Sequence, residues 1–245
     1  MKQKLPLNQR LKGFSLLAFF VLVVSSLQAQ TYYTMSTADY SQSFTSLAAY
    51  PTNWNGLPIL TGAGPIPDPT KTTTATTTLA AVGASAGVQN NTAGGNWQFL
   101  STGATDNTTA VAADLNLDFT SRTAGNISFD LATVFNSTGN RQGTLRLYYS
   151  LNGTTWTEIF GNNIPYVATN NVAGSAAISI ALPNALTNQS TVKLRFYYHN
   201  GTSGGTATGS RPKISLDNVL VTSTAYTPPS LSYTCLLYTS DAADE

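Results

Sequence analysis

Histidine and cysteine are nearly absent from this chain of 245 residues, which contains one of each. Zinc sites usually need several histidine or cysteine ligands, so the sequence argues against a zinc enzyme. A serine hydrolase needs an oriented base beside an exposed nucleophile, and His199 is the one histidine that could serve. The letters of a nucleophile elbow, G-x-S-x-G, occur at Gly83–Gly87, but no helical period follows them, so we interpret the match as chance.

Charged residues are also scarce, at 9% of the chain. Between Gln30 and Thr234, eight basic residues balance eight acidic ones, so nothing favours nucleic acid as a partner. Glu158 is the one glutamate of this stretch and has no acidic residue two or four positions away, whereas a retaining glycosidase needs two carboxylates about 5–5.5 Å apart. We therefore expect that this fragment is not an enzyme.

The first 29 residues have the pattern of a secretory signal peptide. Basic residues dominate the start, an unbroken apolar run spans residues 16–24, and small residues precede Gln30. The apolar run is shorter than the roughly 20 residues that a membrane-spanning helix needs. We expect cleavage after Ala29 and a product that is secreted, extracellular or held at the cell surface, with no membrane span after cleavage.

Beyond the signal peptide no stretch has a helical period, and short alternating runs are separated by polar turns. This pattern predicts an all-β fold, an antiparallel β-sandwich of jelly-roll type over residues 30–224. Five prolines and a threonine run interrupt residues 51–95, which we predict to be a long loop with a short strand near 79–82. Trp54, within it, is expected to be buried rather than to form an exposed binding platform. The predicted strands span residues 97–100, 110–115, 125–135, 143–151, 155–160, 176–182, 191–199 and 213–222.

The clearest local signal is a β-hairpin over residues 143–160, GTLRLYYSLNGTTWTEIF. In its first strand Leu145 and Leu147 alternate with Arg146 and Tyr148, which is typical of a half-buried strand. Residues 152–153, Asn-Gly, predict a two-residue type I′ turn. In the return strand, residues 156, 158 and 160 share one face, and residues 155, 157 and 159 share the other.

The first strand of this hairpin is echoed later in the chain, since LRLYY at 145–149 resembles LRFYY at 194–198. The echo suggests two strands with similar exposure that are neighbours in one sheet. Lys193 and Asp130 are further candidates for the polar face that they would share. We predict that this face binds a ligand through exposed tyrosines beside basic side chains. The predicted binding residues are Arg146, Tyr148, Arg195, Tyr197 and His199.

The last predicted strand contains an irregularity at Asp217 and Asn218. Apolar residues alternate at Ile214 and Leu216 before it, and Val219 continues the alternation shifted by one position. Such a shift is typical of a β-bulge, which inserts one extra residue into a strand. The oxygens of Asp217 and Asn218 are suitable hard ligands for calcium, and structural calcium is therefore one prediction. The alternative is a carboxylate that accepts hydrogen bonds from local backbone amides.

The final residues differ from the rest of the chain. Residues 225–234 are a proline-containing linker, and residues 235–245, CLLYTSDAADE, match the in-frame translation of a transposase adapter used in sequencing libraries. We interpret them as an adapter-derived artefact of a truncated reading frame. On this hypothesis the native protein continues beyond Thr234, and Cys235 carries no redox meaning.

Three segments resemble one known group of domains: residues 39–44 (DYSQSF), 145–156 (LRLYYSLNGTTW) and 214–219 (ISLDNV). The chain resembles the jelly-roll, concanavalin-like modules of secreted multi-domain proteins of Gram-negative bacteria. The resemblance implies a β-sandwich that accompanies nuclease, lamin-tail or sorting domains, and it makes Asp217 a candidate structural calcium ligand.

Two functions are compatible with these features. The first is a secreted, non-catalytic module that binds a polysaccharide, a cell-surface glycan or another cell-surface partner. The alternative is a structural spacer in a truncated secreted enzyme, a nuclease or hydrolase, whose catalytic domain is missing. In both cases we expect a monomeric module.

Overall fold

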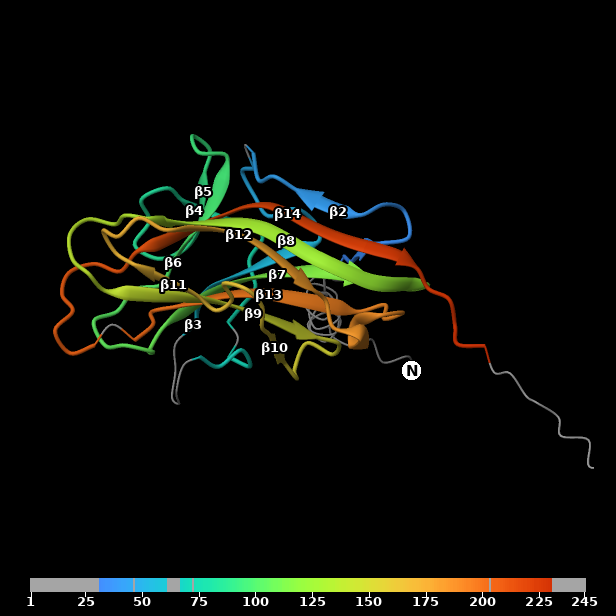
Figure 1. The fold of residues 1–245 in the computed structure, drawn as a ribbon. Coiled ribbons are helices and arrows are strands. Elements are labelled where there is room, and N and C mark those ends of the chain that lie inside the picture. The colour runs from blue at the N-terminus through green and yellow to red at the C-terminus, as the bar shows by residue number, and fades with distance from the viewer. Residues whose placement is uncertain (1–30, 46, 61–66, 72, 203, 231–245) are drawn as a thin grey trace, which may run out of the picture. The chain divides into compact units, whose positions relative to one another are not determined.

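Two β-sheets lie face to face in the computed structural model, which describes residues 31–45, 47–60, 67–71, 73–202 and 204–230 (Figure 1). Sheet A has the strand order β1-β7-β13-β9-β10, with β3 also on β7 and β11 also on β9; sheet B has the order β12-β8-β14-β6-β5-β4, with β2 also on β14. The strands are β1 (Tyr33–Thr34), β2 (Tyr40–Gln42), β3 (Trp54–Leu60), β4 (Ala80–Ala81), β5 (Gly87–Asn91), β6 (Asn96–Leu100), β7 (Ala110–Asp118), β8 (Arg122–Val134), β9 (Gln142–Ser150), β10 (Thr157–Ile159), β11 (Tyr166–Thr169), β12 (Ser175–Ala181), β13 (Val192–His199) and β14 (Lys213–Ala225).

The predicted all-β sandwich of jelly-roll type is confirmed. All eight predicted strands are present, and the sheets are antiparallel except for the short parallel pairs β1–β7 and β4–β5. Among the described residues the helical structure is one 3₁₀ turn, Asn184–Leu186, and no helix there is long and apolar enough to cross a membrane. The predicted signal peptide and the adapter-like residues 235–245 lie outside the described residues.

The core lies between the sheets because alternate side chains of each strand point inward. Leu145 and Leu147 of β9 are fully buried, as the hairpin pattern predicts. Phe196 of β13 meets Phe129 of β8 across the interface, with the ring centroids 5.2 Å apart. Burial of each such side chain stabilises the fold by about 1.5–3 kcal/mol.

The prediction of a long loop over residues 51–95 is wrong, because β3 and β5 lie within it, whereas β4 confirms the short strand predicted near 79–82. Pro58 interrupts the sequence pattern of β3, but it lies at a register shift between Leu57 and Leu60 and on an edge strand, whose one named partner strand is β7. Such edge and bulge positions tolerate proline, which lacks the N–H that a central strand needs. In β5, Gln89 is buried, so its burial pattern does not show as apolar alternation.

Trp54 is buried, as predicted, at 1% exposure. It belongs to an aromatic cluster with Phe44, Trp97 and Phe196, at centroid distances of 5.6, 5.1 and 5.5 Å. Its indole N–H donates to the hydroxyl of Tyr40. The segment before β3 is therefore anchored by ring packing as well as by sheet pairing.

The hairpin of β9 and β10 forms, but its turn is not the predicted type I′ turn. Tyr149 pairs with Thr157, so the loop is one residue longer than a two-residue turn at 152–153 allows. Gly153 has φ of 75°, whereas Asn152 is not in the left-handed region that type I′ requires. Instead, Asn152 Oδ1 accepts hydrogen bonds from the backbone N–H groups of Thr154 (2.9 Å) and Thr155 (2.8 Å). This Asx-type arrangement closes the loop.

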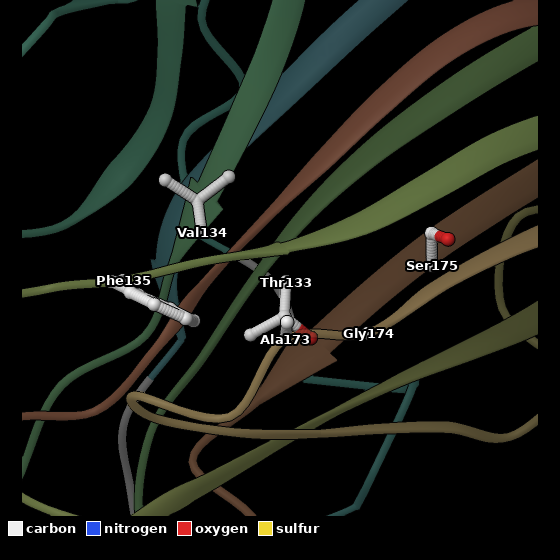
Figure 2. Close-up of a pocket in the computed structure, with 6 residues that line it drawn as sticks. All are labelled: Thr133, Val134, Phe135, Ala173, Gly174 and Ser175. Atoms are coloured by element: carbon white, nitrogen blue, oxygen red, sulfur yellow. The ribbon is translucent and has the colours of Figure 1, made fainter.

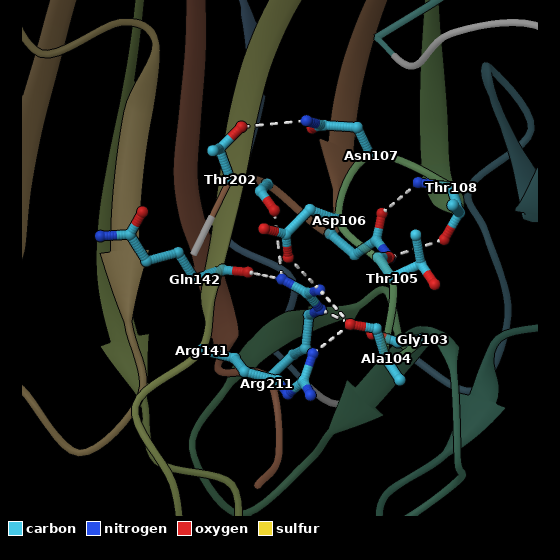
Figure 3. Close-up of polar contacts among 12 residues, drawn as sticks. Gly103, Ala104, Thr105, Asp106, Asn107, Thr108, Arg141, Gln142, Thr202 and Arg211 are labelled. Atoms are coloured by element: carbon cyan, nitrogen blue, oxygen red, sulfur yellow. Dashed lines mark hydrogen bonds and ion pairs between the residues drawn. The ribbon is translucent and has the colours of Figure 1, made fainter. Parts of the chain in front are cut away.

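At one end of the sandwich, Arg211 ties several loops together (Figure 3). It is 2% exposed and donates to the carbonyls of Gln142 (2.7 Å) and Gly103 (2.9 Å), and it forms an ion pair with Asp106 (2.6 Å). Asn200 is buried beside it, and its Oδ1 accepts from the backbone N–H groups of residues 108 and 109. Buried polar groups need such partners, so this network holds the ends of several strands in place.

Candidate functional site

The echo between the two LR-x-YY strands has a structural basis, because β9 and β13 are neighbours in sheet A, as predicted. Arg146 pairs with Tyr197, and Tyr148 pairs with Arg195. These side chains and that of His199 lie on the face of sheet A opposite the core, which we call the outer face. The structure therefore brings all five predicted binding residues together.

The prediction that Tyr148 and Tyr197 are exposed is wrong. Their exposed fractions are 5% and 0%, and Arg195 and His199 are also buried. The two tyrosine rings pack edge to face, with centroids 5.8 Å apart. They belong to a second apolar cluster, on the outer face, formed by Leu57, Leu60, Ala110, Ala112, Tyr148 and Tyr197.

The segment at residues 68–69 covers this second cluster. The backbone N–H of Asp68 donates to the Tyr197 hydroxyl at 3.3 Å, and the guanidinium of Arg195 donates to the carbonyl of Pro69. Residues 68–69, which lie in the region predicted to be a loop, thus pack on the outer face against Tyr197 and Arg195.

Arg195 is the most tightly held of the five residues. Its guanidinium forms two parallel hydrogen bonds with Asp114, from Nε to Oδ1 at 2.6 Å and from Nη2 to Oδ2 at 2.7 Å. Asp114 is its register partner on β7, so the pairing of the two strands places them side by side. The Arg195 guanidinium carbon also lies 3.8 Å from the ring centroid of Trp156. Planar, bidentate geometry of this kind suits arginine better than lysine.

Arg146 is the one of the five that solvent reaches. Its Nη1 lies 2.7 Å from Glu158 Oε1, and the two side chains are 24% and 17% exposed. Its Nε donates to His199 Nε2 at 3.3 Å, which places the imidazole proton on Nδ1, for which the described residues supply no partner. Burial first, and then the charges of Arg146 and Arg211, lower the pKa of His199 to about 4.

Two exposed apolar side chains lie in or next to the strands β10 and β11, which both pair with β9. Ile159 is buried in the core, so alternation places Phe160 on the outer side, where it is 65% exposed. Val167 lies between buried residues of β11, pairs with Thr144 and is 54% exposed. We call the surface formed by Arg146, Glu158, Phe160 and Val167 the β9 edge surface.

Phe160 was not among the predicted site residues. The sequence did carry a usable signal, since residues 156, 158 and 160 alternate on one face of the return strand. Which of them stays exposed depends on packing. Trp156 is partly covered by Arg195, whereas Phe160 directly follows the last residue of β10 and is exposed.

Asp130 does not join the arginines of sheet A, which corrects the prediction for this residue. It lies on β8 of sheet B, where it pairs with Asp217 and accepts a hydrogen bond from Asn218 Nδ2 at 2.8 Å. Its inward neighbours Phe129 and Leu131 are buried as expected. The alternation was interpreted correctly, but it identifies a face of a strand and not the sheet to which that strand belongs.

The predicted bulge at Asp217 and Asn218 is confirmed by a register shift between Asp217 and Leu220 and by a positive φ of 51° at Asn218. Asp217 Oδ1 accepts from the Asn218 backbone N–H at 2.8 Å. Burial, and less strongly the neighbouring Asp130, raise the pKa of Asp217. The described residues contain no group of three or more His, Cys, Asp or Glu placed to share a metal ion.

The G-x-S-x-G letters do not form a nucleophile elbow. Ser85 lies in the turn between β4 and β5, two strands of sheet B, whereas an elbow joins a strand to a helix. The surroundings of His199 given above contain an arginine and an unpaired nitrogen rather than a carboxylate that would orient a base.

Comparison with known proteins finds no matching family model and no matching curated protein. Solved β-sandwich modules are similar in structure. The K1 cleaved adhesin domain of Lys-gingipain from Porphyromonas gingivalis W83 is 12% identical with a TM-score of 0.36, over 78% of this chain and 99% of that domain. TmCBM27, a mannan-recognising carbohydrate-binding module, is 11% identical with a TM-score of 0.39, over 74% and 94%. CBM35 from Paenibacillus barcinonensis is 15% identical with a TM-score of 0.30, over 75% and 98%. Similarity at this level carries no argument about function.

Proposed function

We propose that this protein is a secreted, non-catalytic module that binds a polysaccharide or cell-surface glycan through the β9 edge surface. The observation that carries the proposal is the exposed ring of Phe160 on the same face as the Arg146–Glu158 pair. Sugar rings present an apolar face that stacks on an aromatic side chain, and their hydroxyls bond to charged groups at its margin. The β9 edge surface supplies both kinds of group.

The five residues predicted from the sequence take two roles in this proposal. Arg146 contacts the ligand, because its guanidinium is the one that reaches solvent. Tyr148, Tyr197, Arg195 and His199 lie beside it on the same face and position it. His199 accepts a hydrogen bond from the Arg146 Nε, and the two tyrosine rings pack against each other on the same face. A recognition group that is already held in place loses less conformational freedom when a ligand binds.

Binding can be tested by glycan arrays, followed by calorimetry with any glycan that is retained. Phe160→Ala should weaken binding by about 30-fold, because an aromatic residue at the centre of a binding surface contributes about 2 kcal/mol. Phe135→Ala is the matched control, since Phe135, which directly follows β8 of sheet B, is also largely exposed, at 52%. If no glycan is retained, or if both variants bind as the unaltered protein does, the proposal is wrong and the structural spacer becomes the better explanation.

We also propose that the bulge at Asp217 and Asn218 binds calcium with the help of Asp130. After the hydrogen bonds described above, one oxygen of each carboxylate and the Asn218 side-chain oxygen are available as ligands. Calcium takes 6–8 oxygens, so water must complete the shell. Burial, and less strongly the charge of Asp130, raise the pKa of Asp217, and a bound cation would offset both costs of keeping the carboxylate charged.

Calcium binding predicts a rise in melting temperature on addition of calcium, because a ligand at about 100 times its Kd stabilises the folded state by about 2.7 kcal/mol. Asp217→Asn should remove the rise. Asp118→Asn is the control, because Asp118 ends β7 of the other sheet and, like Asp217, accepts a local backbone hydrogen bond, here from Thr120. An identical melting temperature in calcium and in chelator would contradict the proposal.

A further inference from the structure

Strand β12 is an edge strand whose outer backbone groups have no partner in the described part of the chain. It pairs with β8 alone. In the same register, the N–H of Thr133 donates to the carbonyl of Gly174, and the N–H of Leu182 donates to that of Gly125, both at 2.8 Å. Even-numbered residues therefore bond to β8, and the N–H and C=O groups of Ser175, Ala177, Ser179 and Ala181 point away from the sheet.

The other described edges carry features that block strand addition. β1 and β4 have two residues each, β2 and β10 have three and β11 has four, and β3 contains Pro58 and a register shift. β12 has seven residues, all in continuous register with β8, and no proline. Natural proteins usually protect exposed edges with short strands, bulges, prolines or charges. β12 has none of these.

The region around β12 also lacks charge. No charged residue occurs from Ile159 to Val192, and the side chains that β12 presents to solvent are serine and alanine. A two-fold contact places each residue opposite a residue of the same surface, so any charge near the axis meets a like charge. An uncharged edge with small side chains is therefore compatible with pairing to itself.

We propose that β12 pairs with β12 of a second copy of this chain, antiparallel across a two-fold axis, to form one continuous sheet. In the register centred on Ile178, Ala177 lies opposite Ser179 of the second copy, and their outward N–H and C=O groups form hydrogen bonds. Ala176 then faces Ile180 of the second copy on the core side. This dimer replaces the monomeric module expected from the sequence.

An apolar hollow at the start of β12 fits this arrangement (Figure 2). It has a volume of about 630 Å³ and is lined by Thr133, Val134, Phe135, Ala173, Gly174 and Ser175. The same register places Pro183 of the second copy opposite Ala173. Phe135, which is exposed in the isolated chain, gains an apolar neighbour in the dimer.

Sedimentation velocity over protein concentrations up to about 1 mM tests the proposal. The unaltered chain should form dimers. Ser179→Pro should raise the dimer dissociation constant at least tenfold, because it removes an outward N–H, whereas Ser179→Ala should not. Ala177→Lys should also weaken the dimer, and added salt should partly restore it by screening the repulsion.

Ser128→Lys is the control for added charge. Ser128 is the register partner of Ser179 on β8, one strand in from the edge, so its substitution should leave the dimer intact. Thermal melting establishes that each variant is folded, and Ala177→Lys decides the question if Ser179→Pro is not. A chain that stays monomeric, or a dimer unaffected by Ala177→Lys and by a folded Ser179→Pro, overturns the proposal.

Discussion

Lowering the pH should destabilise the fold through His199. The imidazole is buried on the outer face of sheet A, and the nearby Arg146 and Arg211 add to the cost of charging it, which is why its pKa falls to about 4. The unfolded chain has an ordinary histidine pKa of about 6.5. Between these two values the unfolded state binds a proton that the folded state does not.

The size of the effect follows from this difference in pKa. Because the unfolded state binds more protons in this window, the free energy of unfolding falls as the pH falls. The loss attributable to His199 is about 2 kcal/mol between pH 7 and pH 5, and about 3 kcal/mol by pH 4. The stabilisation that His199 loses on acidification is fully present only above the unfolded-state pKa of about 6.5, where the imidazole is neutral in both the folded and the unfolded state.

Urea unfolding at pH 7 and at pH 5 measures this loss, with His199→Gln as the comparison. Glutamine does not titrate, and its side-chain oxygen can still accept from Arg146 Nε. The variant should therefore lose about 2 kcal/mol less than the unaltered protein between the two pH values. The pH dependence that carboxylates such as Asp217 add to the free energy of unfolding is the same in both proteins and cancels in the comparison. An equal loss in both would refute the assignment of a low pKa to His199.

Two further substitutions test the buried polar contacts. Asp114→Asn leaves the Arg195 guanidinium buried without its counter-charge. It should lower the free energy of unfolding, measured by urea titration, by about 3–5 kcal/mol. A loss below about 1 kcal/mol would mean that the ion pair is unimportant for stability. Asn200→Ala leaves the partly buried backbone N–H groups of Thr108 and Thr109 without their acceptor and should cost about 1–2 kcal/mol, measured in the same way. An unchanged midpoint would show that water replaces the side chain.

Local sequence patterns predicted most of the strands and their inward faces. Leu145 and Leu147 are in the core because period-two alternation reports the face of a strand directly. The bulge at Asp217 was visible as a change of phase. β3 and β5 escaped prediction because Pro58 and Gln89 break the local pattern, and both are tolerated for reasons that lie elsewhere in the fold: an edge position and a buried hydrogen-bonded side chain.

The candidate site was predicted less well. The pairing of Arg146 with Tyr197 could be anticipated from the repeated LR-x-YY pattern, and the structure confirms it. The exposure of Phe160 and the burial of Tyr197 could not, because exposure depends on which other segments cover the face. Asp130 was assigned to the wrong sheet for a related reason, since alternation does not say which strands are neighbours.

By itself the sequence determined that this chain is an all-β sandwich with an LR-x-YY strand pair and a bulged last strand. Those features follow from the side-chain alternation of single strands, which is local. Only the tertiary structure decided that the paired tyrosines are covered. The carbonyl of Pro69 meets Arg195 across 126 positions of sequence, and Asp68 meets Tyr197 across 129. Contacts over such separations depend on how the whole chain packs, and no local pattern records them.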